Sequence, residues 1–73
     1  MYNSDNHKVK ITTHDRLMRA WENSMELTRD FELYSKEIDD DKIRKTFSDF
    51  AIEEGIHAST FREMLMDNQN NAV

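Results

Sequence analysis

Apolar residues recur at alternating steps of three and four along two stretches of this chain, which is the spacing of one face of a helix. The first stripe consists of Leu17, Ala20, Ser24, Leu27, Phe31, Tyr34 and Ile38, and it is widened by Met18, Trp21 and Met25. The second consists of Ile43, Phe47, Phe50, Glu54, His57, Phe61 and Met64, with Ala51, Ala58 and Leu65 beside it. Each stripe persists over about three heptads, so two long amphipathic helices are predicted.

Polar residues mark the ends of these helices. Thr12 and Asp15 have the spacing of a capping box, so the first helix is expected to begin near Thr13. Asp39 to Asp41 interrupt the pattern, and one of the first two is expected to cap the second helix. Because this linker is short, the helices should be antiparallel neighbours. We predict a flexible N-terminal arm over residues 1–12, a helical hairpin over 13–67 and a polar tail over 68–73.

The composition supports an all-α fold that needs a partner. Pro is absent and there is a single Gly, so the turn residues of a β-rich fold are missing. A chain of 73 residues without Cys has a marginal core unless a metal or oligomerisation adds to it. The large side chains are also too numerous for one hairpin to bury. We therefore predict a homodimer, or a higher even-numbered homo-oligomer, in which paired hairpins form a four-helix bundle.

Charge and hydropathy exclude several kinds of partner. The net charge of −5 argues against binding to a nucleic-acid backbone, which needs a basic patch. No apolar run approaches the roughly 18 residues of a membrane span. The N-terminus shows no secretory signal. A cytoplasmic protein is the expectation.

Two polar residues stand where the second stripe calls for apolar ones. Glu54 and His57 are three positions apart, so they project from the same side of a helix and can ligate one metal ion. An unpaired buried carboxylate costs several kcal/mol, so Glu54 needs a cation, a partner or a proton. Glu26 lies as far before Asp40 as Glu54 lies beyond it, which places it at the same height in an antiparallel hairpin. Glu22 and Glu32 are the alternative ligands on the first helix.

A family resemblance rests on this region. The segment from Asp41 to His57 resembles the second helix of ferritin-like, rubrerythrin-type domains, where a Phe and a hydrophobic–Ala pair precede Glu-Glu-x-x-His. The segment from Phe31 to Tyr34 is similar to the aromatic segment after the first-helix Glu of that family. A chain with one such hairpin resembles the encapsulated ferritins, which build their di-iron site between subunits. The resemblance covers about residues 14 to 66.

The resemblance implies a ferritin-like four-helix bundle, made from two hairpins, that holds a di-iron site. Its ligands would be Glu26, Glu54 and His57 of each chain, with Tyr34 donating a hydrogen bond to the site. It also implies an encapsulin shell as a partner and its nanocompartment as a location.

Two functions follow from these features. The first is a ferroxidase that oxidises Fe(II) to Fe(III) for iron storage or detoxification, since carboxylate and imidazole ligands suit iron. The second is a non-catalytic helical oligomerisation or regulatory module, in which Glu54 and His57 form a structural pair that fixes the register of the helices.

Overall fold

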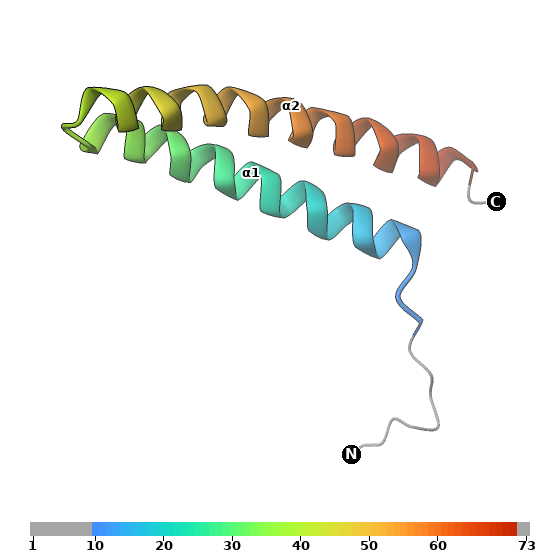
Figure 1. Cartoon of the computed structure of the whole chain (residues 1–73). Coiled ribbons are helices and arrows are strands. Elements are labelled where there is room, and N and C mark those ends of the chain that lie inside the picture. The colour runs from blue at the N-terminus through green and yellow to red at the C-terminus, as the bar shows by residue number, and fades with distance from the viewer. Residues whose placement is uncertain (1–9, 72–73) are drawn as a thin grey trace, which may run out of the picture.

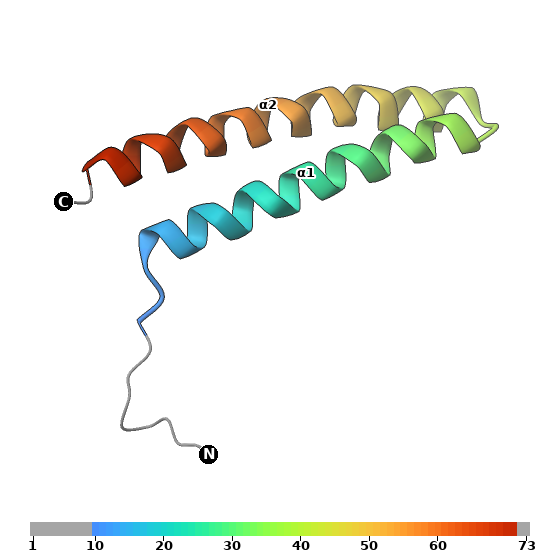
Figure 2. The same ribbon diagram turned by 180° about the vertical axis from the view of Figure 1, so that it is seen from behind.

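The computed structural model describes residues 10–71 and consists of two helices packed side by side in opposite directions (Figure 1). Helix α1 spans Thr13–Glu37 and helix α2 spans Asp41–Asn71. Three residues, Ile38 to Asp40, join them. The view from behind shows the same side-by-side arrangement (Figure 2). The all-helical antiparallel hairpin predicted from the sequence is therefore confirmed.

Both helices begin at the predicted caps. The Thr12 hydroxyl accepts a hydrogen bond from the Asp15 backbone N–H at 3.0 Å, and the Asp15 carboxylate accepts one from the Thr12 N–H at 3.0 Å. This reciprocal pair is a capping box. The Thr12 backbone N–H, followed by the Thr12 hydroxyl, holds the pKa of Asp15 below its usual value. At the second helix, the Asp40 carboxylate accepts from the Ile43 N–H at 2.9 Å.

Helix α2 runs further than the apolar pattern indicated. The hairpin was expected to end near residue 67, and residues 68–73 were expected to form a polar tail. The helix instead continues to Asn71, so residues 68–71 are helical. Polar side chains alone do not stop a helix, and neither Gly nor Pro follows Met66 to do so. Residues 10–12 precede α1 as expected, while the predictions for residues 1–9 and 72–73 lie outside the described residues.

The seam between the helices is made of small residues with aromatic rings toward the turn. Ala51, Ala58 and Leu65 of α2 and Ser24 of α1 are the buried residues of the described chain. Toward the turn, the rings of Phe31 and Phe47 lie 5.5 Å apart. The three buried residues of α2 are those predicted to lie beside the apolar stripe. The stripe is therefore rotated so that Phe47 remains at the seam while Phe50 and Met64 are turned outward. A core of this size is marginal for a domain that folds alone.

The hairpin is one helix thick. Its smallest extent is 12 Å, which is about the diameter of a single helix with its side chains. Both flat faces of the described residues are consequently exposed. No helix within residues 10–71 is long and apolar enough to cross a membrane.

Gly55 offers a direct test of the packing in the middle of α2. A methyl group added at this position would meet no other atom within 4 Å. We therefore expect Gly55→Ala to raise the free energy of unfolding by about 0.5–1 kcal/mol, because alanine loses less backbone entropy in a helix. Thermal unfolding followed by circular dichroism measures this. Ala58→Gly, one turn further on and in the buried seam, should lower the stability. A fall in stability for Gly55→Ala would show that another chain packs against this position.

Candidate metal centre

One flat face of the hairpin carries large apolar side chains from both helices. On each helix, a residue three positions after a seam residue is rotated about the helix axis, away from the seam, and the angle is the same on both helices. Because the helices are antiparallel and face each other, that rotation brings both sets out on the same side of the hairpin. The set, which we call the apolar face, consists of Leu27, Tyr34, Phe50, His57 and Met64, with Ile43 at the turn end.

The exposed fractions of these side chains show that nothing else in the described residues covers this face. Tyr34 reaches across the seam, where its ring meets that of Phe47 edge-on with centroids 5.4 Å apart. Phe50 and Met64 are nonetheless 47% and 48% exposed. Fully burying such a side chain is worth about 1.5–3 kcal/mol, so much of the hydrophobic stabilisation that this sequence can supply is unused in a single hairpin.

The predicted Glu54–His57 pair lies on this face. The Glu54 carboxylate oxygen Oε2 and the His57 ring nitrogen Nδ1 are 3.4 Å apart. The Glu54 side chain is 20% exposed, because it leans into the seam, and the His57 side chain is 58% exposed. When His57 is protonated this contact is an ion pair; when it is neutral, both groups can offer lone pairs to a cation. The structure therefore brings these two predicted ligands together.

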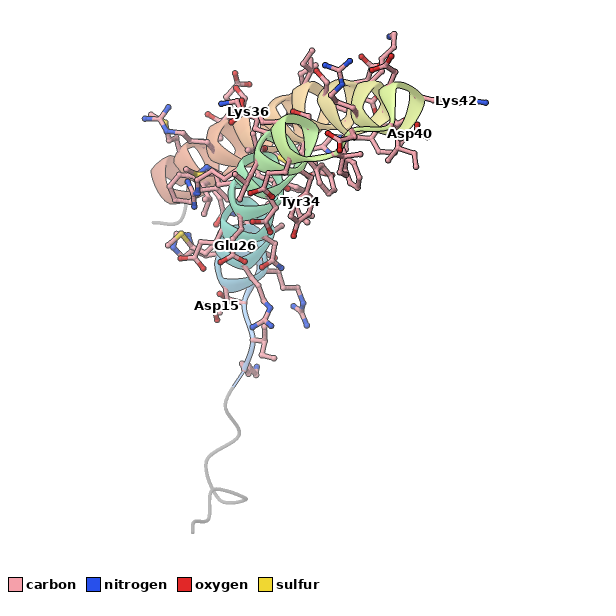
Figure 3. All side chains as sticks on the ribbon, turned by 90° about the vertical axis from the view of Figure 1, so that its left-hand side faces the viewer. Asp15, Glu26, Tyr34, Lys36, Asp40 and Lys42 are labelled. Carbon is pink, nitrogen blue, oxygen red and sulfur yellow. The ribbon has the colours of Figure 1, made fainter. Side chains whose placement is uncertain are left out.

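Glu26 is not brought to this pair. It lies two positions from Ser24, which is buried in the seam, and two positions correspond to a rotation of about 200° around a helix. The Glu26 side chain is exposed on the side of α1 that faces away from α2 (Figure 3). The matching height that the sequence predicted is compatible with the hairpin, but the rotation of α1 points the carboxylate outward.

The alternative carboxylates of α1 do not replace it. Glu22 is also two positions from Ser24 and is exposed on the same outer side. Glu32 follows Phe31 directly, which turns it toward the flat face opposite Tyr34. Within residues 10–71 there is accordingly no group of three or more His, Cys, Asp or Glu side chains that could hold a metal ion.

In the seam of the hairpin, the residue of α1 at the same level as Glu54 is a serine. Phe31 and Phe47 meet in one layer of the seam. One heptad away from the turn on each helix, the same layer relationship joins Ser24 to Glu54. Ser24 was predicted only as part of the apolar stripe. As a metal donor, its hydroxyl is weaker than a carboxylate.

The donors of one hairpin are thus one carboxylate and one imidazole. Two donors are too few to hold iron firmly, yet both belong to the set that iron accepts. A second copy of this chain, packed on the apolar face, would supply two more donors of the same kind. Covering this face would also desolvate Glu54, which raises the cost of leaving its charge without a cation.

In comparisons with known proteins, no family model, curated protein or solved structure matches this chain. The resemblance to ferritin-like domains consequently stays a prediction from the sequence, as do the encapsulin partner and its compartment.

Proposed function

We propose that two copies of this chain pair through their apolar faces and oxidise Fe(II) at a site between them. Glu54 and His57 of each copy supply the donors, two carboxylates and two imidazoles in all. The observation that carries the proposal is the position of this pair, at 3.4 Å, in the middle of an exposed apolar face.

Pairing through a dyad axis follows from the shape of the surface. In a twofold dimer the same patch on each copy contacts its equivalent, so each apolar face is covered by an identical one. The heptad spacing of Phe50, His57 and Met64 is suited to such helix-on-helix packing. The resulting four-helix bundle places Glu54 and His57 on either side of the dyad, near its centre.

Iron is the substrate of the proposed reaction. Each Fe(II) loses one electron, so two Fe(II) ions in turn supply the two electrons that reduce one dioxygen to hydrogen peroxide, with two protons taken from water; four Fe(II) ions and four protons reduce it to water. The two Glu54 carboxylates favour Fe(III) over Fe(II), since the attraction of a fixed negative charge grows with the charge of the ion. The two His57 rings complete the coordination without adding charge. A second iron would need further donors, and Glu26 is directed away from the pair, so we limit the proposed ligands to Glu54 and His57.

The test compares two glutamates of α2, one on the apolar face side and one on the outer side of the helix. We expect the wild-type chain to bind Fe(II) anaerobically and to oxidise it when air is admitted, followed by absorbance of Fe(III). Glu54→Gln should reduce the oxidation rate about 10–100-fold or more, because it removes a charged ligand from each copy. Glu63→Gln is the matched control, since Glu63 is exposed and lies two positions from the buried Leu65, which places it on the outer side of α2. Equal rates for both variants, or no oxidation by the wild type, would contradict the proposal.

The outward direction of Glu26 favours a second candidate function. With only two donors from each chain, the same pairing would serve a non-catalytic oligomerisation or regulatory module whose Glu54–His57 contacts fix the register. Metal content after exposure to Fe(II) in air separates the two. Iron bound in proportion to paired chains supports the ferroxidase, and paired chains free of iron support the module.

A further inference from the structure

A second group of potential metal donors lies at the open end of the hairpin, on the flat face opposite the apolar face. Here the first turns of α1 and the last turns of α2 border an open cavity of about 320 Å³. Its wall consists of His14, Met18, Trp21, Arg62, Leu65 and Met66. None of these residues belongs to the Glu54–His57 pair, so the cavity is separate from the proposed iron site.

Three of the lining side chains carry donors suited to a soft metal. His14 and Met18 are four positions apart on α1, so their ring nitrogen and thioether sulfur leave the helix on the same side, one turn apart. Met66 brings a second thioether from α2. Thioethers select soft ions such as Cu(I), whereas hard ions and iron prefer oxygen donors. Methionine has three rotatable bonds, which lets both sulfurs adjust to an ion in the cavity.

Two other side chains that line the cavity favour an ion of low positive charge. Trp21 lines the same cavity, and the face of an indole ring attracts a cation through its quadrupole. Arg62 also lines it, and its guanidinium repels any cation. That repulsion is proportional to the charge of the ion, so it opposes a divalent ion twice as strongly as a monovalent one. The donors and the charges therefore both favour a soft monovalent ion.

We propose that this cavity binds Cu(I) through His14, Met18 and Met66, with Trp21 beside the ion. Buried Leu65 forms the apolar floor that keeps water from one side of it. The site is complete within one hairpin and does not depend on iron binding. Its failure and the failure of the proposed ferroxidase are therefore distinguishable.

Ag(I) is the probe, because it is a soft monovalent ion that does not change oxidation state in air. Trp21 is the only tryptophan of the chain, so its fluorescence reports on this cavity alone. We expect silver nitrate, added in buffer without chloride, to quench this fluorescence with a stoichiometry of one ion per chain. Competition with a Cu(I) chelator then measures the affinity for Cu(I) under reducing conditions.

Two methionines of α2 form the matched comparison. Met66→Leu removes a proposed ligand, while Met64→Leu makes the same change two positions away on the apolar face; the two residues are 50% and 48% exposed. We expect Met66→Leu to weaken Ag(I) binding about 10–100-fold and Met64→Leu to leave it unchanged. His57→Ala should also leave it unchanged. Equal effects of the two methionine variants, or the absence of stoichiometric quenching in the wild type, would overturn the proposal and leave the cavity as packing.

Discussion

Replacing Phe50 by Asp is expected to separate the proposed pair into single chains with a reduced helix content. Phe50 is at the centre of the apolar face and is 47% exposed in the hairpin, so its remaining surface is available to a second copy. A twofold pair contains the substitution twice. The lost burial of two rings and the desolvation of two carboxylates together cost at least about 3 kcal/mol. That corresponds to a dissociation constant more than about 100-fold higher.

Sedimentation velocity at micromolar concentration measures this, with circular dichroism to follow the helices. Ile52→Asp is the matched control, because Ile52 is two positions away on the same helix, is 64% exposed and lies off the apolar face. We expect this variant to remain paired. The reverse result, with pairing lost for Ile52→Asp and kept for Phe50→Asp, would assign the contact to the other side of α2. A wild-type chain that is monomeric and stably folded would contradict the pairing itself.

His57→Ala is expected to abolish most iron oxidation while the pair of chains persists. The substitution removes one imidazole from each copy, and loss of a metal ligand or of its supporting contact costs about 10–100-fold or more in affinity or activity. A space between the copies that admits iron also admits water when iron is absent. Glu54 is 20% exposed in the single hairpin and less once the face is covered, but the space left by the missing ring admits water beside its carboxylate, so the pair should persist.

The non-catalytic module predicts a different outcome for the same variant. If His57 is only the cationic partner of Glu54, its removal strands a buried carboxylate and weakens the pair by about 3–5 kcal/mol. Measuring Fe(II) oxidation and sedimentation side by side distinguishes the two. Ser59→Ala, an exposed change on the opposite flat face of α2, should alter neither readout. Wild-type oxidation by His57→Ala would remove the ferroxidase assignment.

The position of α2 against α1 illustrates where sequence reasoning reaches its limit. Two neighbouring heptad series on α2 are mostly apolar, with His57 as the polar member of one of them. One contains Ala51, Ala58 and Leu65, and the other contains Phe50 and Met64. The sequence predicted the series with the larger side chains as the centre of the buried stripe. The hairpin buries the smaller ones, since small side chains let two helix backbones approach closely, and the larger ones remain on the open face.

The same rotation of the helices determined which of the predicted ligands lie close together. Glu54 and His57 were predicted together from their spacing on one helix, a relation that helix geometry alone fixes. Glu26 was predicted from its height relative to the turn. Height depends only on the number of residues from the turn, whereas direction depends on which side of α1 faces its neighbour, and that side is set by Ser24.

The sequence by itself determined the two helices, the Thr12 cap, a second cap at Asp39 or Asp40, the antiparallel turn and the contact between Glu54 and His57. All of these follow from interactions between residues close in the chain, where helical periodicity and capping chemistry are sufficient. Only the tertiary structure decided which stripe forms the seam, that Glu26 points outward, and that His14, Met18 and Met66 line one cavity. These depend on the rotation of each helix about its axis, which is chosen by packing across the seam between residues distant in sequence.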